Sequence, residues 1–348
     1  MKTVGYAAQG AGEHLAPWHF DRRQARPNDV VMEILYCGIC HTDIHMRDND
    51  WGFAHYPLVP GHEIVGRVIE VGSQVTKFKV GDNGAVGCMV DSCQECDQCK
   101  KGNEQFCREG NTMTYSSPDR IDGAITQGGY SKHIVVREDF VCTLSDKLDL
   151  SRTAPILCAG ITTWSPLRHW NIGPSSRVAV IGMGGLGHMA VKLASALGAS
   201  VTQISRSLKK KAVAMEIGAD AFLVSTDADA MKAAYNGFDL IIDTIPVKHD
   251  LDVYVPLLDI DGTLVIVGAV GPWGEVDGAP LLLGRRSVAG SPIGGIRETQ
   301  EVLDFCARKN ILPECKIIRP DEINDAFVTL EKADIPYRFV MDMSYLHV

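Results

Sequence analysis

The sequence has no excess of positive charge. Its 34 Lys and Arg residues are outnumbered by 43 Asp and Glu residues, which gives a formal net charge of −9. The basic residues are scattered, apart from the run KKK at 209–211. Nucleic-acid-binding surfaces need clustered positive charge. We therefore expect no nucleic-acid partner.

The sequence also lacks segments that would export the chain or place it in a membrane. No apolar run approaches the roughly 20 residues that a membrane-spanning helix needs. The first ten residues, MKTVGYAAQG, do not combine a basic region with an apolar core as a secretory signal does. We expect a cytoplasmic protein that makes no membrane contact.

Internal repeats and low-complexity linkers are absent as well. Apolar residues make up 45% of the chain and charged residues 22%, proportions typical of a soluble globular protein. A chain of 348 residues is too long for one ordinary hydrophobic core. The sequence therefore predicts two domains.

Cysteine, in contrast, is plentiful, with 11 residues. Cys93, Cys96, Cys99 and Cys107 lie in CQECDQCKKGNEQFC with the spacing C-x2-C-x2-C-x7-C. In a reducing cytoplasm, clustered thiols bind metals more often than they form disulfides. Four thiolates leave a zinc ion no open position, which is typical of a structural site. The alternative is an iron–sulfur cluster or redox-active thiol pairs, although ferredoxin-type runs have a different fourth spacing.

The pattern of apolar residues changes along the chain. The first 150 residues are rich in short strand-like segments, and from about residue 175 strand-like and helix-like segments alternate. Apolar strands between amphipathic helices indicate a parallel sheet covered on both faces. The predicted strands are 30–40, 63–72, 130–137, 177–182, 200–205, 221–225, 238–244, 262–270 and 337–343; the predicted helices are 186–198, 208–218 and 298–310.

A glycine-rich turn follows the first strand of this alternating region. VAVIGMGGLGHMAVKLA contains Gly182, Gly184 and Gly187 as G-x-G-x-x-G, with Gly185 and Leu186 between the last two glycines. Between a strand and a helix, this pattern lets a dinucleotide pyrophosphate approach the helix N-terminus. The alternative is an ordinary glycine-rich turn.

The end of the next strand indicates which dinucleotide binds. An NAD site places an acidic residue there for the ribose 2′-hydroxyl. Here the chain has Ser205, Arg206 and Ser207, with Lys210 close behind. Hydroxyls and cations suit a 2′-phosphate, so we predict NADP. Otherwise Lys209 to Lys211 form a solvated helix face.

Several motifs together resemble one family. CGICHTDIH, YPLVPGHEIVG, the four-cysteine stretch, LCAGITTWSPLRHW and GMGGLGH are similar to those of the zinc-dependent medium-chain alcohol dehydrogenases. The nearest branch holds the cinnamyl alcohol dehydrogenases and bacterial broad-range aldehyde reductases. The resemblance implies an α/β fold of two domains. These are a GroES-like β-rich catalytic domain (1–152 and 296–348, zinc lobe at 88–110) and a doubly wound Rossmann domain (153–295).

The resemblance also implies a second, catalytic zinc. Cys40, His62 and Cys158 would bind it, and two thiolates with one imidazole leave a fourth position open. Glu63 would be a further carboxylate that swings onto the metal. Asp43 would accept a hydrogen bond from the far nitrogen of His62 and so fix its orientation.

Other roles follow from the same resemblance. Thr42 would take the alcohol proton and pass it through the cofactor ribose to His45, whose imidazole titrates near neutrality. His41 and Arg338 would lie at the cofactor phosphates. The alternatives are a plain surface histidine at 45 and a solvated strand-end charge at 338.

The predicted substrate pocket is apolar and partly aromatic, which suits primary alcohols and aldehydes. Trp51 is equally interpretable as a core residue. Thr112 replaces a large aromatic residue of the plant branch, which favours broad substrate use over cinnamyl specificity. The predicted pocket residues are Trp51, Phe53, Leu58, Thr112, Pro292 and Ile293.

These observations predict an NADP-dependent zinc alcohol dehydrogenase that works mainly as an aldehyde reductase, with two zinc ions per chain. The resemblance further implies a homodimer formed through the segment 287–295, which would extend the cofactor sheet across a two-fold axis. Two alternatives stand beside this function. One is an NAD-dependent polyol or other secondary-alcohol dehydrogenase, which would normally carry an acidic residue at 205–207. The other is a non-catalytic zinc protein.

Overall fold

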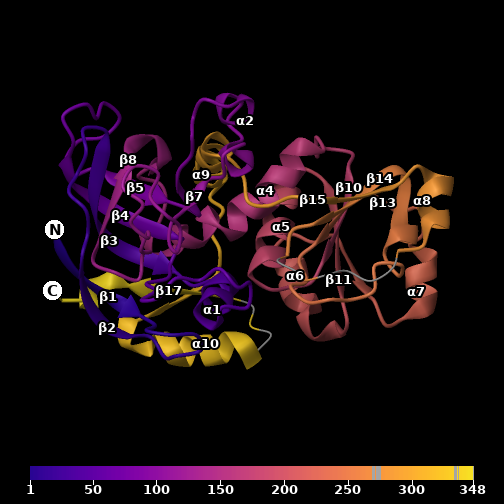
Figure 1. The fold of residues 1–348 in the computed structure, drawn as a ribbon. Coiled ribbons are helices and arrows are strands. Elements are labelled where there is room, and N and C mark those ends of the chain that lie inside the picture. The colour runs from indigo at the N-terminus through magenta and orange to yellow at the C-terminus, as the bar shows by residue number, and fades with distance from the viewer. Residues whose placement is uncertain (269–270, 272–275, 333–334, 336, 348) are drawn as a thin grey trace. The chain divides into compact units, whose positions relative to one another are not determined.

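The computed structural model describes residues 1–268, 271, 276–332, 335 and 337–347. They form two compact units, Met1–Cys158 with Gly294–Val348 and Ala159–Ile293 (Figure 1). The chain therefore leaves the first unit and later returns to it. It crosses at 158/159 and 293/294, a few residues from the predicted junctions at 152/153 and 295/296.

The first unit is built on a seven-stranded sheet. Its long central strand β3 (Asp29–Gly38) carries the run VVMEILYCG and is buried over most of its length. Antiparallel pairing with β4 sets Cys37 of β3 opposite Ile64 of β4. The sheet order is β16 (Cys315–Ile318), β17 (Arg338–Asp342), β3, β4 (Ile64–Val71), β5 (Asn83–Val86) and β9 (Cys142–Thr143), with β8 (His133–Arg137) also pairing with β3.

Two further antiparallel strand pairs and, among the described residues, five α-helices belong to this unit. The pairs are β1 (Lys2–Ala7) with β2 (Ala16–Asp21) and β6 (Met89–Asp91) with β7 (Thr112–Met113). The helices are α1 (His41–Asp48), α2 (Asp97–Lys100), α3 (Leu150–Thr153), α9 (Ile296–Lys309) and α10 (Ile323–Lys332). In α9, Val302, Leu303 and Cys306 are buried on one face, as the period of an amphipathic helix requires.

The second unit is a doubly wound sheet. Its six strands, all parallel, run in the order β12 (Ala221–Val224), β11 (Ser200–Ser205), β10 (Arg177–Ile181), β13 (Phe238–Asp243), β14 (Leu258–Ile266) and β15 (Ser287–Gly290). Its helices are α4 (Ala159–His169), α5 (Gly185–Ala196), α6 (Lys211–Glu216), α7 (Ala228–Ala233) and α8 (Gly278–Gly284). The strand order reverses between β10 and β13, which is where such sheets bind dinucleotides.

The predicted fold class is confirmed. The strands predicted at 177–182, 200–205, 221–225 and 238–244 correspond to β10, β11, β12 and β13. The strand predicted at 262–270 begins earlier, as β14, and residues 269 and 270 lie outside the described residues. Among the helices of the described part, none is both long and apolar enough to cross a membrane.

Candidate functional site: two metal-binding clusters and a glycine-rich turn

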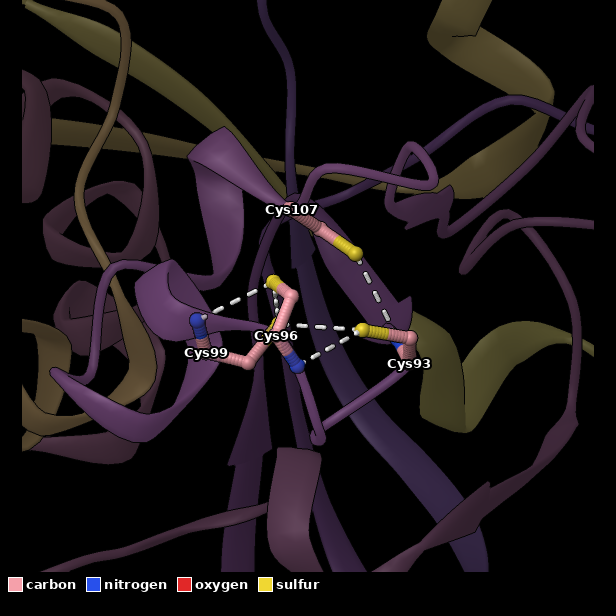
Figure 2. Close-up of side chains that lie close together, drawn as sticks. All are labelled: Cys93, Cys96, Cys99 and Cys107. Carbon is pink, nitrogen blue, oxygen red and sulfur yellow. Dashed lines mark hydrogen bonds between the residues drawn. The ribbon is translucent and has the colours of Figure 1, made fainter.

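The four cysteines of the lobe come together around α2 (Figure 2). Their sulfur atoms all lie within 4.8 Å of one another. Backbone N–H groups bind these sulfurs: Cys96 N–H donates to Cys93 Sγ at 3.3 Å, and Cys99 N–H donates to Cys96 Sγ at 3.5 Å. The N–H groups of Arg108 and Cys99 hold the pKa of Cys96 at about 6. The local backbone therefore favours a thiolate at Cys96, whereas burial raises the pKa of Cys99 to about 12.

The lobe is attached to α9. Glu104, between the third and fourth cysteines, accepts a hydrogen bond at 3.0 Å from the N–H of Ile296, in the first turn of α9. Arg297 donates at 2.6 Å to the carbonyl of Lys101. A carboxylate at a helix N-terminus accepts a hydrogen bond from a free N–H group and interacts favourably with the positive end of the helix dipole. The four-cysteine lobe is thereby connected to a long helix of the first unit.

A second cluster lies inside the first unit. Cys40 caps α1 just after β3, His62 and Glu63 precede β4, and Cys158 follows the 3₁₀ helix Ala154–Leu157. Antiparallel pairing brings the end of β3 beside the start of β4, which is why Cys40 and His62 meet. The ligand atoms of all four residues lie within 4.8 Å of one another, and all four are buried. The Sγ atoms of Cys40 and Cys158 are 3.8 Å apart.

Asp43 orients the histidine of this cluster. Its Oδ1 lies 3.2 Å from His62 Nδ1, as the resemblance implied, so Nε2 is the ring nitrogen left for a metal. Burial opposes a charged imidazolium, but Asp43 overcomes this effect and the pKa of His62 is raised well above its usual value. Tyr115 and Tyr130, which the sequence analysis did not single out, also donate to Asp43.

Glu63 forms a buried ion pair with Arg338. Arg338, the first residue of β17, donates from Nη2 to Glu63 Oε1. Glu63 Oε2 has no hydrogen-bond partner among the described residues. Burial raises the pKa of Glu63 to about 7, although Arg338 opposes this rise. The alternative of a solvated strand-end charge at Arg338 is wrong, because the side chain is buried; its contact with cofactor phosphates stays a prediction.

The predicted proton-relay residues lie on α1. Thr42 is half-buried in the first turn, and His45 lies one turn further along. His45 Nδ1 is 2.7 Å from Asp50 Oδ2, a partner that the sequence analysis did not name. His41 Nε2 lies 3.1 Å from the carbonyl oxygen of Leu330 in α10.

The structure divides the predicted pocket residues. Trp51 and Phe53 are 37% and 44% exposed, and their rings stack with centroids 5.9 Å apart. The interpretation of Trp51 as a core residue is therefore wrong. Leu58 is fully buried against Met46 and Tyr115, so it is not a pocket wall as predicted. The side chain of Leu58 is buried because Ala54 and Tyr56 also pack against this cluster.

Thr112 pairs with Asp91 in the short β6–β7 ladder. It is buried in β7 and lines a cavity of about 400 Å³ together with Phe20, Arg22 and Arg26. None of the four residues of the buried cluster lines this cavity. The place of Thr112 in the substrate pocket stays a prediction. Pro292 and Ile293 lie at the end of the second unit, after β15.

The glycine-rich turn has the expected shape. Gly182 follows β10 with φ +88°, a conformation that favours glycine. A Cβ at Gly187 would lie 2.2 Å from the carbonyl oxygen of Gly182, whereas one at Gly184 would meet nothing. Gly185 and Leu186 then begin α5. The buried Gln203 donates to the carbonyl of Gly182 at 2.8 Å and fixes the turn.

The predicted 2′-phosphate residues lie at the end of the neighbouring strand. Ser205 ends β11, and Arg206 and Ser207 follow it with Arg206 exposed. Lys210 Nζ donates to the carbonyl of Met183 at 2.6 Å, so this lysine reaches the glycine-rich turn. The interpretation of 209–211 as a plain solvated face is therefore wrong for Lys210.

Comparison with known proteins identifies the family. The alcohol dehydrogenase GroES-like domain matches residues 26–146, and the zinc-binding dehydrogenase domain matches residues 185–308. The chain is 52% identical over 348 residues to an NADP-dependent alcohol dehydrogenase C of Mycolicibacterium smegmatis, with 99% of each chain covered.

Solved structures agree with this match. A cinnamyl alcohol dehydrogenase from Sorghum bicolor has a TM-score of 0.95 at 43% identity, covering 99% of this chain and 98% of that one. A cinnamyl alcohol dehydrogenase from Helicobacter pylori, complexed with NADP(H), has a TM-score of 0.92 at 42% identity, with 99% of each covered. The chain therefore belongs to the zinc-dependent medium-chain alcohol dehydrogenases, in the branch that contains the cinnamyl alcohol dehydrogenases.

Proposed function

We propose that the protein is an NADP-dependent zinc alcohol dehydrogenase that interconverts primary alcohols and aldehydes, mainly as an aldehyde reductase. The observation that carries this proposal is the buried cluster of Cys40, His62, Glu63 and Cys158. Two thiols and an imidazole are the donor set of a catalytic zinc site that keeps one position for substrate. The four-cysteine lobe would hold a second, structural zinc.

The residues present fit a zinc ion at the buried cluster. The donors are soft sulfur and imidazole nitrogen, which zinc prefers, and Asp43 already fixes the tautomer of His62. Glu63 keeps Oε2 without a hydrogen-bond partner among the described residues, which suits an exchangeable carboxylate. When bound, zinc would polarise the carbonyl or alcohol oxygen and NADP(H) would supply or accept the hydride.

Residues of α1 would carry the proton. The Thr42 hydroxyl would accept it from the alcohol, and His45 would exchange it with solvent. His45 is about one-third exposed and its Nδ1 lies 2.7 Å from Asp50 Oδ2, so it has access to water and a carboxylate partner. The exposed, stacked rings of Trp51 and Phe53 would form an apolar wall for the substrate tail.

Two observations support NADP. Ser205 to Ser207 offer two hydroxyls and an arginine where an NAD site has a carboxylate. Relatives of similar fold and length are named as NADP-dependent or complexed with NADP(H). The lack of a carboxylate at 205–207 also argues against an NAD-dependent polyol dehydrogenase. Arg338 and His41 would lie toward the cofactor phosphates.

We further propose a homodimer in the cytoplasm. β15 is an edge strand of its sheet, so a second copy would satisfy its free backbone groups. Leu282 and Leu283, just before it in α8, are more than four-fifths exposed, and a partner chain would cover them. The cytoplasm is proposed because all eleven cysteines are free of disulfides.

The test is a spectrophotometric assay at 340 nm with benzaldehyde or cinnamaldehyde and either NADPH or NADH. We expect NADPH to be preferred, and Arg206→Ala to raise the KM for NADPH between about tenfold and a hundredfold, since a charge-assisted hydrogen bond contributes about 1.5 to 3 kcal/mol. Lys232→Ala, which removes an exposed charge of α7, is the control and leaves KM unchanged. Equal use of both cofactors by the wild type would contradict the NADP assignment, and no turnover with either would contradict the function.

A further inference from the structure

We propose that Tyr115 and Tyr130 are positioning residues for the buried metal site, because their phenol hydroxyls hold the carboxylate that orients His62. This inference rests on the proposed function, since it presupposes a zinc ion at Cys40, His62 and Cys158. It concerns two residues of this chain that no motif of the sequence marks.

The Asp43 carboxylate is surrounded by donors. Tyr115 donates its hydroxyl to Oδ1 and Tyr130 donates to Oδ2, both at 2.8 Å. Backbone N–H groups of Cys40 and Gly61 donate to Oδ2 and Oδ1 at 2.9 and 3.1 Å. His62 Nδ1 is the remaining neighbour of Oδ1, at 3.2 Å. The phenols therefore make the two shortest contacts of this carboxylate.

Burial makes these contacts necessary. Asp43 and Tyr130 have no exposed surface and Tyr115 is 2% exposed, so no solvent replaces a missing donor. An ionised carboxylate that loses a partner in such a place costs free energy or moves toward another donor. Burial, and then the nearby Asp43, raise the pKa of each tyrosine well above its usual value, so both hydroxyls stay protonated as donors.

The two tyrosines come from separate parts of the fold. Tyr115 follows β7, and its ring lies 5.9 Å from the ring of His62. Tyr130 precedes β8, and its backbone N–H donates at 2.9 Å to Pro60, two residues before His62. Asp43, on α1, is thus held by two loops, each of which also packs beside His62 or the segment before it.

The expected chemistry follows from the limited capacity of the carboxylate. With two phenols and two N–H groups bound, Asp43 has a fixed position and only a moderate pull on the Nδ1 proton of His62. Removal of a hydroxyl would take one donor from an oxygen of Asp43, so the carboxylate and the imidazole that it orients would be held less firmly in place. The metal would then be held less firmly by Nε2.

The experiment uses Tyr115→Phe and Tyr130→Phe, which keep each ring and remove only the hydroxyl. Tyr56→Phe is the matched control, because its hydroxyl donates to the carbonyl of Arg47 at 2.6 Å and not to Asp43. Zinc release to a chromogenic chelator is followed in the full chain, with the zinc of the four-cysteine lobe as internal reference. The visible spectrum of cobalt at the buried site is recorded in the same variants.

We expect the zinc ion of the buried site to leave about tenfold faster in each variant. This is the lower end of the effect that loss of a hydrogen-bond partner of a metal ligand has on metal affinity. The cobalt bands would shift, while the lobe zinc and the Tyr56→Phe control would behave as in the wild type. Unchanged release and unchanged cobalt bands in both variants, with two zinc ions bound, would overturn this inference alone. A wild-type chain that holds only the lobe zinc would overturn the proposed function, and this inference with it.

Discussion

The two metal-binding clusters of the first unit are assembled in different ways. The four-cysteine lobe takes all its ligands from residues 93–107, and backbone N–H groups hold its sulfurs in place. The buried cluster takes its ligands from three distant segments, and side chains such as Asp43 and Arg338 hold them. The lobe is a local structure, whereas the buried cluster exists only when the whole sheet has formed.

This difference suggests that the lobe serves the stability of the protein and the buried cluster serves its chemistry. Four thiolates complete a zinc coordination sphere and leave nothing to react. The buried cluster combines sulfur, imidazole and the Glu63 carboxylate, which is paired with Arg338, and in our proposal this donor set leaves one position of the zinc ion open for substrate. We therefore expect damage to the lobe to lower stability, and damage to the buried cluster to lower activity.

The largest effect is expected for Cys158→Ser. Loss of one of three ligands removes the metal that stabilises several kcal/mol of transition-state charge, so kcat should fall about a thousandfold. Elemental analysis should find one zinc per chain instead of two, and circular dichroism should be unchanged. Activity within threefold of wild type, with the buried zinc lost, would contradict the assignment.

Cys99→Ser, in the lobe, should lower the stability of the protein and leave kcat largely unchanged. The lobe closes a loop of fifteen residues, 93–107, and loss of such a cross-link costs about 3 kcal/mol of unfolding free energy. Chemical denaturation would measure this loss. The kcat of the protein that remains folded should fall far less than in Cys158→Ser, and a comparable fall would mean that the lobe takes part in catalysis.

The smallest effect is expected for Trp51→Ala. An aromatic stacking contact contributes about 0.5 to 1.5 kcal/mol, so KM for benzaldehyde should rise up to roughly tenfold with little change in kcat. Phe106→Ala, which removes an exposed aromatic ring from the lobe, is the control. Equal KM values for benzaldehyde in the two variants would contradict the assignment of Trp51 to the substrate pocket.

The sequence predicts best what depends on local pattern. The alternation of apolar strands with helices predicts β10 to β13, and the cysteine spacing predicts the lobe. The glycine spacing likewise predicts the turn after β10, because each of these features is complete within a few dozen residues. Long-range pairing is different. Nothing in the spacing brings Cys40 and Cys158 together, and only the family resemblance suggested them.

The errors also have physical causes. Leu58 lies in an irregular segment where no period shows which side of the chain is buried, so its predicted place in the pocket was wrong. Tyr115 and Tyr130 were missed because a phenol that satisfies a buried carboxylate carries no motif. Asp50, the partner of His45, is one of many acidic residues, and only the fold distinguishes it.

The most direct measurement is a time course of zinc removal from the wild-type protein by a chelator, with activity and folding followed in the same sample. We predict that the first equivalent of zinc leaves with all of the NADPH-dependent aldehyde reductase activity while the fold stays intact. The second equivalent should leave only with loss of stability. Full activity after one equivalent has gone, or unfolding that coincides with loss of activity, would contradict the division of roles between the two clusters.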